Sequence, residues 1–316
     1  MRLLISGGAG YVGSVLVEAL LHAHETRDLG IRQVTVLDNF RHGVPSLAHL
    51  CSDPALEIVR GDARDATTMA RLLKDADVLI PLAAIVGAPA CDADVEGATS
   101  TNVGAIRTAV SLMSKDQRIL IPITNSGYGI GEPGKECTED SPLRPVSLYG
   151  RTKVEAEEAV LARGNAISFR LATVFGMSPR MRLDLLVNDF VHRAVTDRAV
   201  VLFEAGFKRN YVHVRDVARV FLHGLEHFET MRDRPYNVGL SDANLTKWEL
   251  CERIKAHVPS FWFTEAPVGT DPDKRDYSVS NARIESTGWR PAYSLDDGII
   301  ELVKGMRMIR GDHRNA

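Results

Sequence analysis

"SGGAGYVGSVL", residues 6–16, is the stretch that decides the fold of this chain. It follows the apolar run "RLLIS" at 2–6 and contains Gly-x-Gly-x-x-Gly at Gly8, Gly10 and Gly13, overlapped by a second glycine pattern that starts at Gly7. Glycines at this spacing allow a tight turn, a close backbone approach to a phosphate and a helix packed against the strand. Free N–H groups at the helix start favour an anion. The stretch predicts a strand, a turn that binds a dinucleotide pyrophosphate, and a helix over 12–24.

The end of the next apolar run narrows the choice of dinucleotide. "QVTVLDNF" at 33–40 places Asp38 at a strand end. A carboxylate there can accept hydrogen bonds from both hydroxyls of an adenosine ribose and would repel a 2′-phosphate. We expect NAD, and NADP is the less favoured alternative because Arg41 is close enough to offset that repulsion. The cofactor-binding residues expected from these two stretches are Gly7, Gly10, Tyr11, Val12, Gly13, Asp38 and Asn39.

Short apolar runs alternate with amphipathic segments along the first half of the chain. The runs lie at 2–6, 33–38, 56–62, 77–84, 118–126 and 166–176, and helices are expected at 12–24, 99–115 and 147–163. Strands that are apolar on both faces need helices on both faces, which right-handed crossovers supply. The pattern predicts a doubly wound parallel α/β (Rossmann) sheet over 1–176, to which 213–239 returns. A smaller substrate-binding lobe is expected from 177–212 and 240–316.

Composition limits the partners. The chain has 316 residues and a formal net charge of -3, which gives no electrostatic reason to expect nucleic acid or an anionic membrane. No secretory leader or apolar stretch of membrane-spanning length is visible, so a cytoplasmic location is expected. The four cysteines are scattered without the paired spacing of a metal site. No metal is expected.

"SLYGRTK", residues 147–153, places Tyr149 four positions before Lys153. On a helix these side chains are neighbours, and a nearby cation favours the phenolate form of a tyrosine. "PITNSGYG" at 122–129 ends the preceding strand, so Thr124 and Ser126 bring hydroxyls to the carboxyl edge of the sheet. Ligands of doubly wound sheets bind at that edge. The pair and the hydroxyls therefore indicate an acid/base site beside the dinucleotide.

With these motifs in order, the chain resembles the extended short-chain dehydrogenase/reductases, in particular the NAD-dependent nucleotide-sugar epimerase/dehydratase family. The resemblance also covers "GDARD", "LAAIVG", "RLATVFG", "RNYVHVRDVA" and "YNVG". It implies that Tyr149 is the catalytic acid/base, that Lys153 holds the nicotinamide ribose, and that Thr124, in preference to Ser126, orients the reacting carbinol. The further cofactor-binding residues that it implies are Asp62 and Ala63 near the adenine, Leu82, Ala83 and Ala84 near the nicotinamide, and Asn102, Tyr149 and Lys153.

The residues after Thr124 bear on the reaction. Dehydratases of the family carry an Asp-Glu pair there, whereas this chain has Asn125 and Ser126, and neither is a competent acid/base near neutral pH. We therefore expect reversible oxidation at one sugar carbon, most simply by a C4 epimerase that retains NAD. The alternatives are a reductase or dehydrogenase that releases NAD(P)H and, less favoured, a 4,6-dehydratase or a non-catalytic dinucleotide sensor.

A nucleotide sugar is the substrate that the resemblance implies. The expected substrate-binding residues are Val86, Thr124, Asn125, Ser126, Arg182, Asn188, Arg209 and Arg275, the last two near the diphosphate because guanidinium groups suit phosphate oxygens. The loop "IVGAPACD" departs from common family loops, which leaves the sugar open. By analogy with family members, helices 99–115 and 147–163 are expected to pair two copies into a homodimer.

Overall fold

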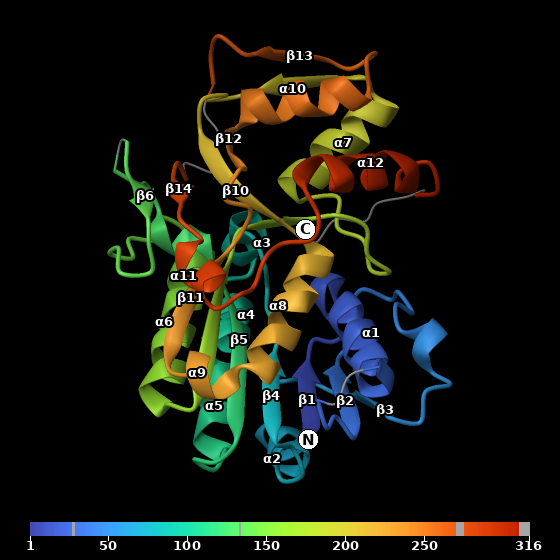
Figure 1. The fold of residues 1–316 in the computed structure, drawn as a ribbon, viewed down its shortest axis with the longest axis vertical. Coiled ribbons are helices and arrows are strands. Elements are labelled where there is room, and N and C mark those ends of the chain that lie inside the picture. The colour runs from blue at the N-terminus through green and yellow to red at the C-terminus, as the bar shows by residue number, and fades with distance from the viewer. Residues whose placement is uncertain (27–28, 133, 270–274, 310–316) are drawn as a thin grey trace.

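Seven parallel strands form the central sheet. The computed structural model describes residues 1–26, 29–132, 134–269 and 275–309, so 270–274 and 310–316 of the expected lobe lie outside the described residues. The strands are β1 (Arg2–Ser6), β2 (Gln33–Asp38), β3 (Leu56–Arg60), β4 (Val78–Pro81), β5 (Arg118–Thr124), β7 (Ala166–Leu171) and β11 (Arg234–Val238). Their order in the sheet is β11-β7-β5-β4-β1-β2-β3. The predicted doubly wound α/β fold is confirmed (Figure 1).

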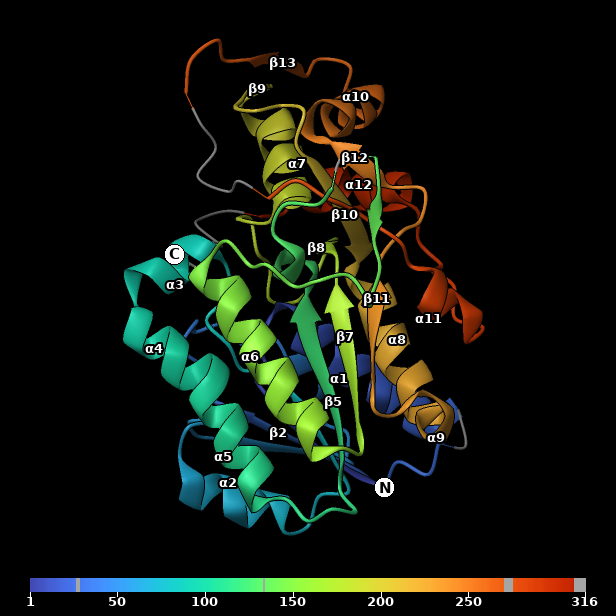
Figure 2. The ribbon, with the colours of Figure 1, turned by 90° about the vertical axis from the view of Figure 1, so that its left-hand side faces the viewer.

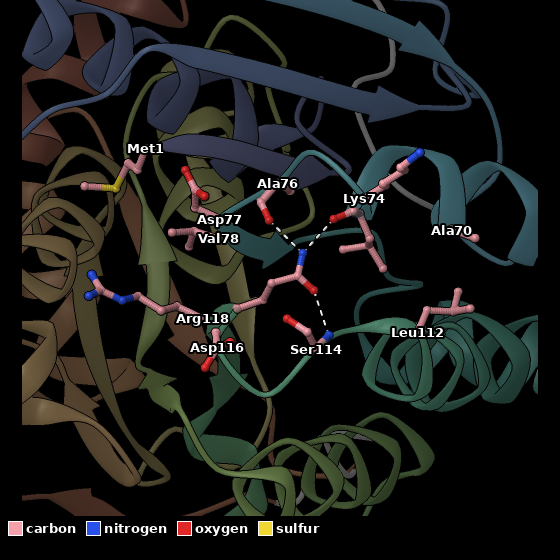
Figure 3. A pocket seen from close by; sticks show the side chains of 12 residues that line it. Met1, Ala70, Lys74, Ala76, Asp77, Val78, Leu112, Ser114, Asp116 and Arg118 are labelled. Atoms are coloured by element: carbon pink, nitrogen blue, oxygen red, sulfur yellow. Dashed lines mark hydrogen bonds between the residues drawn. The ribbon is translucent and has the colours of Figure 1, made fainter.

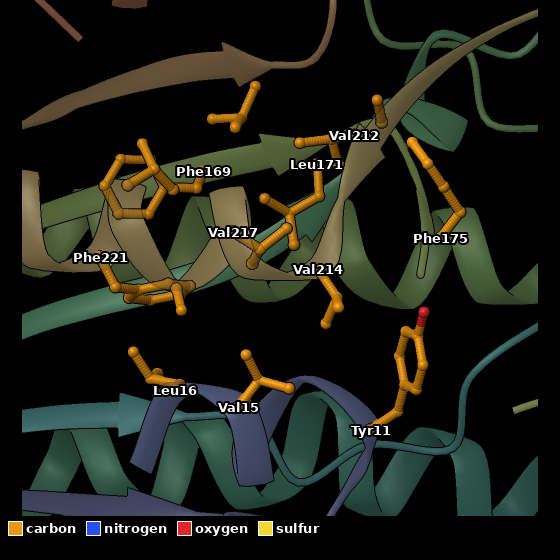
Figure 4. Close-up of a cluster of buried hydrophobic side chains, with 14 of the residues drawn as sticks. Tyr11, Val15, Leu16, Phe169, Leu171, Phe175, Val212, Val214, Val217 and Phe221 are labelled. Carbon is orange, nitrogen blue, oxygen red and sulfur yellow. The ribbon is translucent and has the colours of Figure 1, made fainter. Parts of the chain in front are cut away.

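Helices cover both faces of this sheet because its strands carry apolar side chains on both sides. In β1, Leu3 and Ile5 join the core on one face and Leu4 joins the core on the other. The first face packs on α1 (Tyr11–Thr26) and α8 (Val214–Glu226), where Leu16 lies near Phe221 (Figure 4). The second face packs on α2 (Ala66–Leu73), α5 (Ala105–Leu112) and α6 (Leu148–Arg163), seen in front of the sheet in Figure 2.

Helix α6 carries the predicted acid/base pair, and its ends follow from sequence. Ser147 is the N-cap, and its side chain accepts a hydrogen bond from Gly150 N at 3.1 Å. Gly164 follows the last turn with φ 77°, a conformation that suits glycine. These caps fix Tyr149 in the first turn of α6 and Lys153 one turn later.

The lobe above the carboxyl edge of the sheet is built mainly from later residues (Figure 1). Its strands are β8 (Thr173–Phe175), β10 (Lys208–His213) and β12 (Asn244–Thr246) in one sheet and β9 (Ala199–Leu202) with β13 (Trp262–Glu265) in another. Its helices are α7 (Leu186–Thr196), α10 (Lys247–His257) and α12 (Leu295–Gly305). The remaining elements are η1 (Ala48–Leu50), α3 (Ala88–Ala93), η3 (Asn125–Tyr128), β6 (Glu136–Cys137), α9 (Phe228–Met231), β14 (Ser278–Val279) and α11 (Ala282–Ser286).

Two predicted elements differ from the structure. The strand expected at 166–176 is broken at Ala172, because β7 pairs with β5 and β11 whereas β8 pairs with β10 of the lobe. The helix expected at 99–115 consists of α4 (Val95–Thr99), a π-helical turn (Ser100–Gly104) and α5, which ends at Leu112. The π-helical turn contains Asn102, which holds a neighbouring loop, and such turns recur at functional sites.

Among the described residues, every helix is too short or too polar to cross a membrane.

Candidate functional site

A cavity of about 910 Å³ opens at the carboxyl edge of the central sheet. The sequence-predicted residues that line it are Gly7, Gly10, Tyr11, Val12, Gly13, Asp38, Asn39, Asp62, Ala63, Leu82, Ala83, Ala84, Val86, Thr124, Ser126, Tyr149, Lys153, Arg182, Arg209 and Arg275. Three predicted site residues, Asn102, Asn125 and Asn188, do not line it.

The turn between β1 and α1 has no room for side chains at its glycines. A Cβ on Gly7, where φ is 79°, would lie 2.4 Å from Ala83 N, and a Cβ on Gly13 would lie 2.5 Å from Gly7 O. The loop after β4 is held against this turn, because Leu82 N and Ala83 N both donate to Ser6 O, at 2.7 and 2.8 Å. The backbone is thus open to a ligand at the start of α1, where N–H groups favour phosphate.

Two carboxylates line the cavity at the carboxyl ends of β2 and β3 and have different surroundings. Asp38 at the end of β2 accepts hydrogen bonds from Ala9 N at 3.0 Å and Phe40 N at 2.8 Å, which fixes its orientation toward the turn. Asp62 is ion-paired with Arg64 at 2.6 Å, and the hydrogen bond from that guanidinium lowers the pKa of Asp62.

Thr124, Tyr149 and Lys153 meet in the wall of the cavity. Thr124 ends β5, and its hydroxyl donates to Ser126 Oγ at 2.8 Å and lowers the pKa of the Tyr149 phenol. Lys153 is 6% exposed on the next turn of α6. Residues from two elements therefore bring a hydroxyl, a phenol and an amine to one cavity wall.

Burial dominates the protonation of this group, which differs from the sequence argument. Burial raises the pKa of Tyr149 to about 12, although Arg182 and Arg275 act in the opposite direction. Burial also lowers the pKa of Lys153 to about 8, while Glu157 one turn further along α6 opposes that change. The cations that act on the phenol are therefore chiefly two arginines, since the lysine is itself desolvated.

The three asparagines outside the cavity wall have other surroundings. Asn102 connects Ile85 N, at 2.8 Å, with Thr152 Oγ1, at 3.2 Å, and so joins the loop after β4 to α6. Asn188 donates to the Tyr11 hydroxyl at 3.2 Å and accepts from Gly176 N at 3.1 Å. In the described part of the chain, both polar atoms of the Asn125 side chain are buried without a hydrogen-bond partner.

Basic side chains enclose the substrate end of the cavity. Arg182 lies on residues 176–185, which connect β8 to α7 and are called the covering segment below, and its guanidinium is paired with Asp184. Arg275 donates to Ser126 Oγ, beside the strand end that carries Thr124. Arg209 of β10 lies over the ring of Tyr277, with 5.8 Å from guanidinium carbon to ring centre. This cluster suits a negatively charged ligand.

A second cavity, of about 870 Å³, lies at the opposite edge of the sheet, where Met1, Asp77 and Arg118 stand at the amino ends of the strands (Figure 3). Gln117 fills part of its wall, and its Nε2 donates to Leu73 O and Ala76 O, both at 2.6 Å. Ligands of doubly wound sheets bind at the carboxyl ends of the strands, so we place the functional site in the first cavity.

Comparison with known proteins decides the family. The model of the NAD dependent epimerase/dehydratase family matches residues 3–239. The chain belongs to this family. UDP-glucuronic acid decarboxylase 1 of Arabidopsis thaliana is 28% identical over 97% of this chain and 70% of its own length. UDP-glucose 4-epimerase of Corynebacterium glutamicum is 26% identical over 100% of this chain and 98% of its own. The fold is shared with UDP-glucuronic acid 4-epimerase from Bacillus cereus, solved with UDP-glucuronic acid and NAD, at a TM-score of 0.85, 21% identity and coverage of 98% and 99%.

NAD, the cofactor of this family, fits the residues described above. The glycine turn exposes backbone that a Cβ at Gly7 or Gly13 would close, and Asp38 stands at the adjacent strand end. Gly7, Gly10 and Gly13 would hold the pyrophosphate, Asp38 the adenosine ribose, and Lys153 the nicotinamide ribose.

Several residues that line the cavity, or act on a side chain that does, were missed in the sequence. Glu157, which acts on Lys153, stands four positions after it, and that helical spacing could have revealed it. Lys247 and Tyr277 line the cavity from the lobe without a local motif. Arg180 lines it from the covering segment, and nothing in "SPRMRLD" distinguishes it from Arg182.

Proposed function

We propose that the protein is an NAD-dependent nucleotide-sugar 4-epimerase. The observation that carries this proposal is that Thr124, Tyr149 and Lys153 line the same cavity as the glycine turn and Asp38. That arrangement suits removal of a hydroxyl proton beside a bound dinucleotide. NAD, when bound, supplies the acceptor and later the donor of the hydride.

In this proposal, the phenol of Tyr149 exchanges one proton with the sugar hydroxyl. Its raised pKa keeps it protonated near neutral pH, which suits the return of a proton to a ketone oxygen. Arg182 and Arg275 lower that pKa and so ease the opposite transfer. Thr124, which lines the same cavity as the phenol, orients the reacting carbinol, and Lys153 holds the nicotinamide ribose.

The residues beyond Thr124 support epimerisation over dehydration. Asn125 has no titratable group, and Ser126 shares its hydroxyl with Thr124 and Arg275. Elimination of water from neighbouring carbons needs a base and an acid, and neither side chain supplies one near neutral pH.

Arg209 and Arg275 are proposed to bind the diphosphate of the nucleotide sugar, and Val86 and Arg182 to approach the sugar. Their support is the shared cavity wall and the suitability of guanidinium groups for phosphate oxygens. We assign cofactor binding to 1–176 with 213–239 and substrate binding to 177–212 with 240–316.

Proton NMR tests this function. The protein is incubated separately with UDP-, GDP-, CDP- and dTDP-sugars, and the anomeric region is followed. We expect a new anomeric signal from one of them without added cofactor, and stoichiometric NAD released when the purified protein is unfolded. An empty protein that turns over only with added NADPH would identify a reductase, and turnover of none of the sugars would support a dinucleotide sensor.

Decarboxylation of a nucleotide-linked uronic acid is the second candidate. Oxidation at C4 of such a sugar gives a β-keto acid, which loses carbon dioxide readily. The observation that favours it is Arg182, the charge that acts most strongly on Tyr149, because a guanidinium group suits a carboxylate on the neighbouring carbon. UDP-glucuronic acid in the same NMR experiment separates the candidates, since an epimer keeps the carboxylate and a decarboxylated product does not.

We further propose a homodimer formed through α5 and α6. Val95 of α4 and Leu112 of α5 are 55% and 39% exposed and offer apolar contacts on this side of the sheet. Light scattering tests the mass in solution, and a mass of 34.7 kDa would identify a monomer.

A further inference from the structure

Arg180 is a buried cation for which no partner is found in the described part of the chain. The residue is only 4% exposed, and its side chain lines the cavity. Its guanidinium makes no hydrogen bond, ion pair or ring contact with another described residue, and the carboxylates of Asp184 and Asp38 act on it only through their charge. Arg182, two positions later, is held by Asp184. A buried cation without a partner destabilises the fold. Its presence in a ligand cavity therefore points to an anionic ligand that pairs with it.

The covering segment is fastened directly to the glycine turn. Ser178 Oγ donates to Tyr11 O at 2.7 Å and lies 3.1 Å from Ser14 Oγ. The Tyr11 hydroxyl in turn donates to Gly176 O at 2.7 Å. Arg180 stands two residues beyond Ser178, so its guanidinium enters the cavity close to the start of α1.

The charges around Arg180 place it along the length of the cavity. Toward Asp38, which is among the charged groups that act on Arg180, Arg180 acts on His42 more strongly than Arg41 and Arg182 do. Toward the catalytic end, its strongest charged neighbour is Arg182, which also acts on Tyr149. Arg180 therefore lies between the end that suits the adenosine ribose and the end that contains the reacting groups.

The group of a dinucleotide that lies between its two riboses is the pyrophosphate. Its oxygens accept paired hydrogen bonds from the planar guanidinium. We propose that Arg180 binds the pyrophosphate of NAD from the side of the covering segment, opposite the N–H groups of the glycine turn. The cofactor then connects the lobe to the central sheet.

Calorimetric titration of protein freed of bound nucleotide tests this assignment without any measurement of turnover. Arg180→Gln should weaken binding of NAD and of ADP-ribose, which keeps the pyrophosphate, by at least about tenfold each, as expected for loss of a charge-assisted hydrogen bond. Arg180→Lys should recover part of the affinity for both. The melting temperature of the nucleotide-free variant should not fall, because the substitution removes an unpaired buried charge.

Arg253→Gln is the matched control, since Arg253 lies on α10 of the same lobe and is paired with Asp296 at 2.6 Å, and neither residue lines the cavity. It should leave the affinity for NAD unchanged. Unchanged binding of NAD and ADP-ribose by Arg180→Gln would overturn the proposal. So would a loss confined to NADP, which would assign Arg180 to a 2′-phosphate, or a loss confined to UDP, which would assign it to the substrate. A lower melting temperature of the nucleotide-free variant with unaltered NAD binding would show a structural role.

The titration and the NMR experiment test the two proposals independently, so one proposal can be rejected while the other stands. An inactive protein that still loses NAD affinity on Arg180→Gln would remove the proposed epimerase and leave this assignment intact.

Discussion

Two buried arginines, Arg170 behind α6 and Arg180 on the covering segment, are 5% and 4% exposed but have opposite surroundings. Arg170 pairs with Glu157 at 2.8 Å and donates to the Tyr128 hydroxyl and Glu139 O, both at 3.1 Å. Despite burial, hydrogen bonding and charge from Glu157 raise the pKa of Arg170, whereas burial lowers the pKa of Arg180.

The difference separates scaffold from site. Behind α6, the charge of Arg170 is paired with the carboxylate of Glu157, which also acts on Lys153. On the covering segment, the charge of Arg180 remains available to a ligand. Equal burial therefore does not imply an equal role, and the partners of a buried charge are the better guide to function.

Breaking the satisfied pair should give the largest effect. Arg170→Met leaves Glu157 buried without its cation, and we expect the free energy of unfolding to fall by about 3–5 kcal/mol. Urea denaturation measures the change. The double variant Arg170→Met/Glu157→Met should recover much of the stability, and a double variant as unstable as the single one would contradict the role given to this pair.

Removing the hydroxyl of Tyr149, the proposed acid/base, should act on turnover alone. Tyr149→Phe is expected to lower kcat at least about 100-fold, the loss typical of a positioned acid/base, with little change in NAD affinity. Steady-state kinetics on the sugar identified by NMR measure this. Tyr128→Phe is the matched control, because the Tyr128 hydroxyl bonds Asn237 at 2.7 Å in the scaffold and should affect stability by about 1 kcal/mol instead.

The buried amine of Lys153 should make stability depend on pH. Its pKa of about 8 lies below the value of 10.5 for an unfolded lysine, so charging it opposes folding below pH 8, and that penalty disappears as the pH rises from 8 to 10.5. Lys153→Met should therefore be more stable at pH 7 by on the order of 1–3 kcal/mol. The advantage should shrink toward pH 10.5, and a difference independent of pH would argue against a desolvated amine.

Breaking an exposed ion pair should have the smallest effect on the free energy of unfolding. Arg64 and Asp62 are 47% and 36% exposed and form a pair at 2.6 Å. Arg64→Gln should change the free energy of unfolding by less than about 0.5 kcal/mol, because water replaces the lost contact. A loss comparable to that of Arg170→Met would show that burial is not what separates the two pairs.

The sequence predicted most reliably those features that depend on residues close together in the chain. The glycine turn, Asp38 at a strand end and the four-residue spacing of Tyr149 and Lys153 predicted the sheet and the side chains that meet in its cavity. The functions of those residues stay predictions. What escaped prediction depends on distant partners, since Asn188 is held by Tyr11, 177 positions away, and the break after β7 depends on β10. No local pattern in the sequence distinguishes the roles of Arg170 and Arg180, because the fold determines which of them pairs with a carboxylate.

The position of β11 in the sheet has a consequence for synthesis on the ribosome. Strand β7 ends at Leu171 and its outer neighbour β11 begins at Arg234, so 62 residues, 172–233, must be made before the edge of β7 is paired. At roughly 5–20 residues per second, that edge stays open for about 3–12 s in each nascent chain. During this interval, β7 and its apolar Phe169 are a target for chaperones and a point where two nascent chains can associate wrongly.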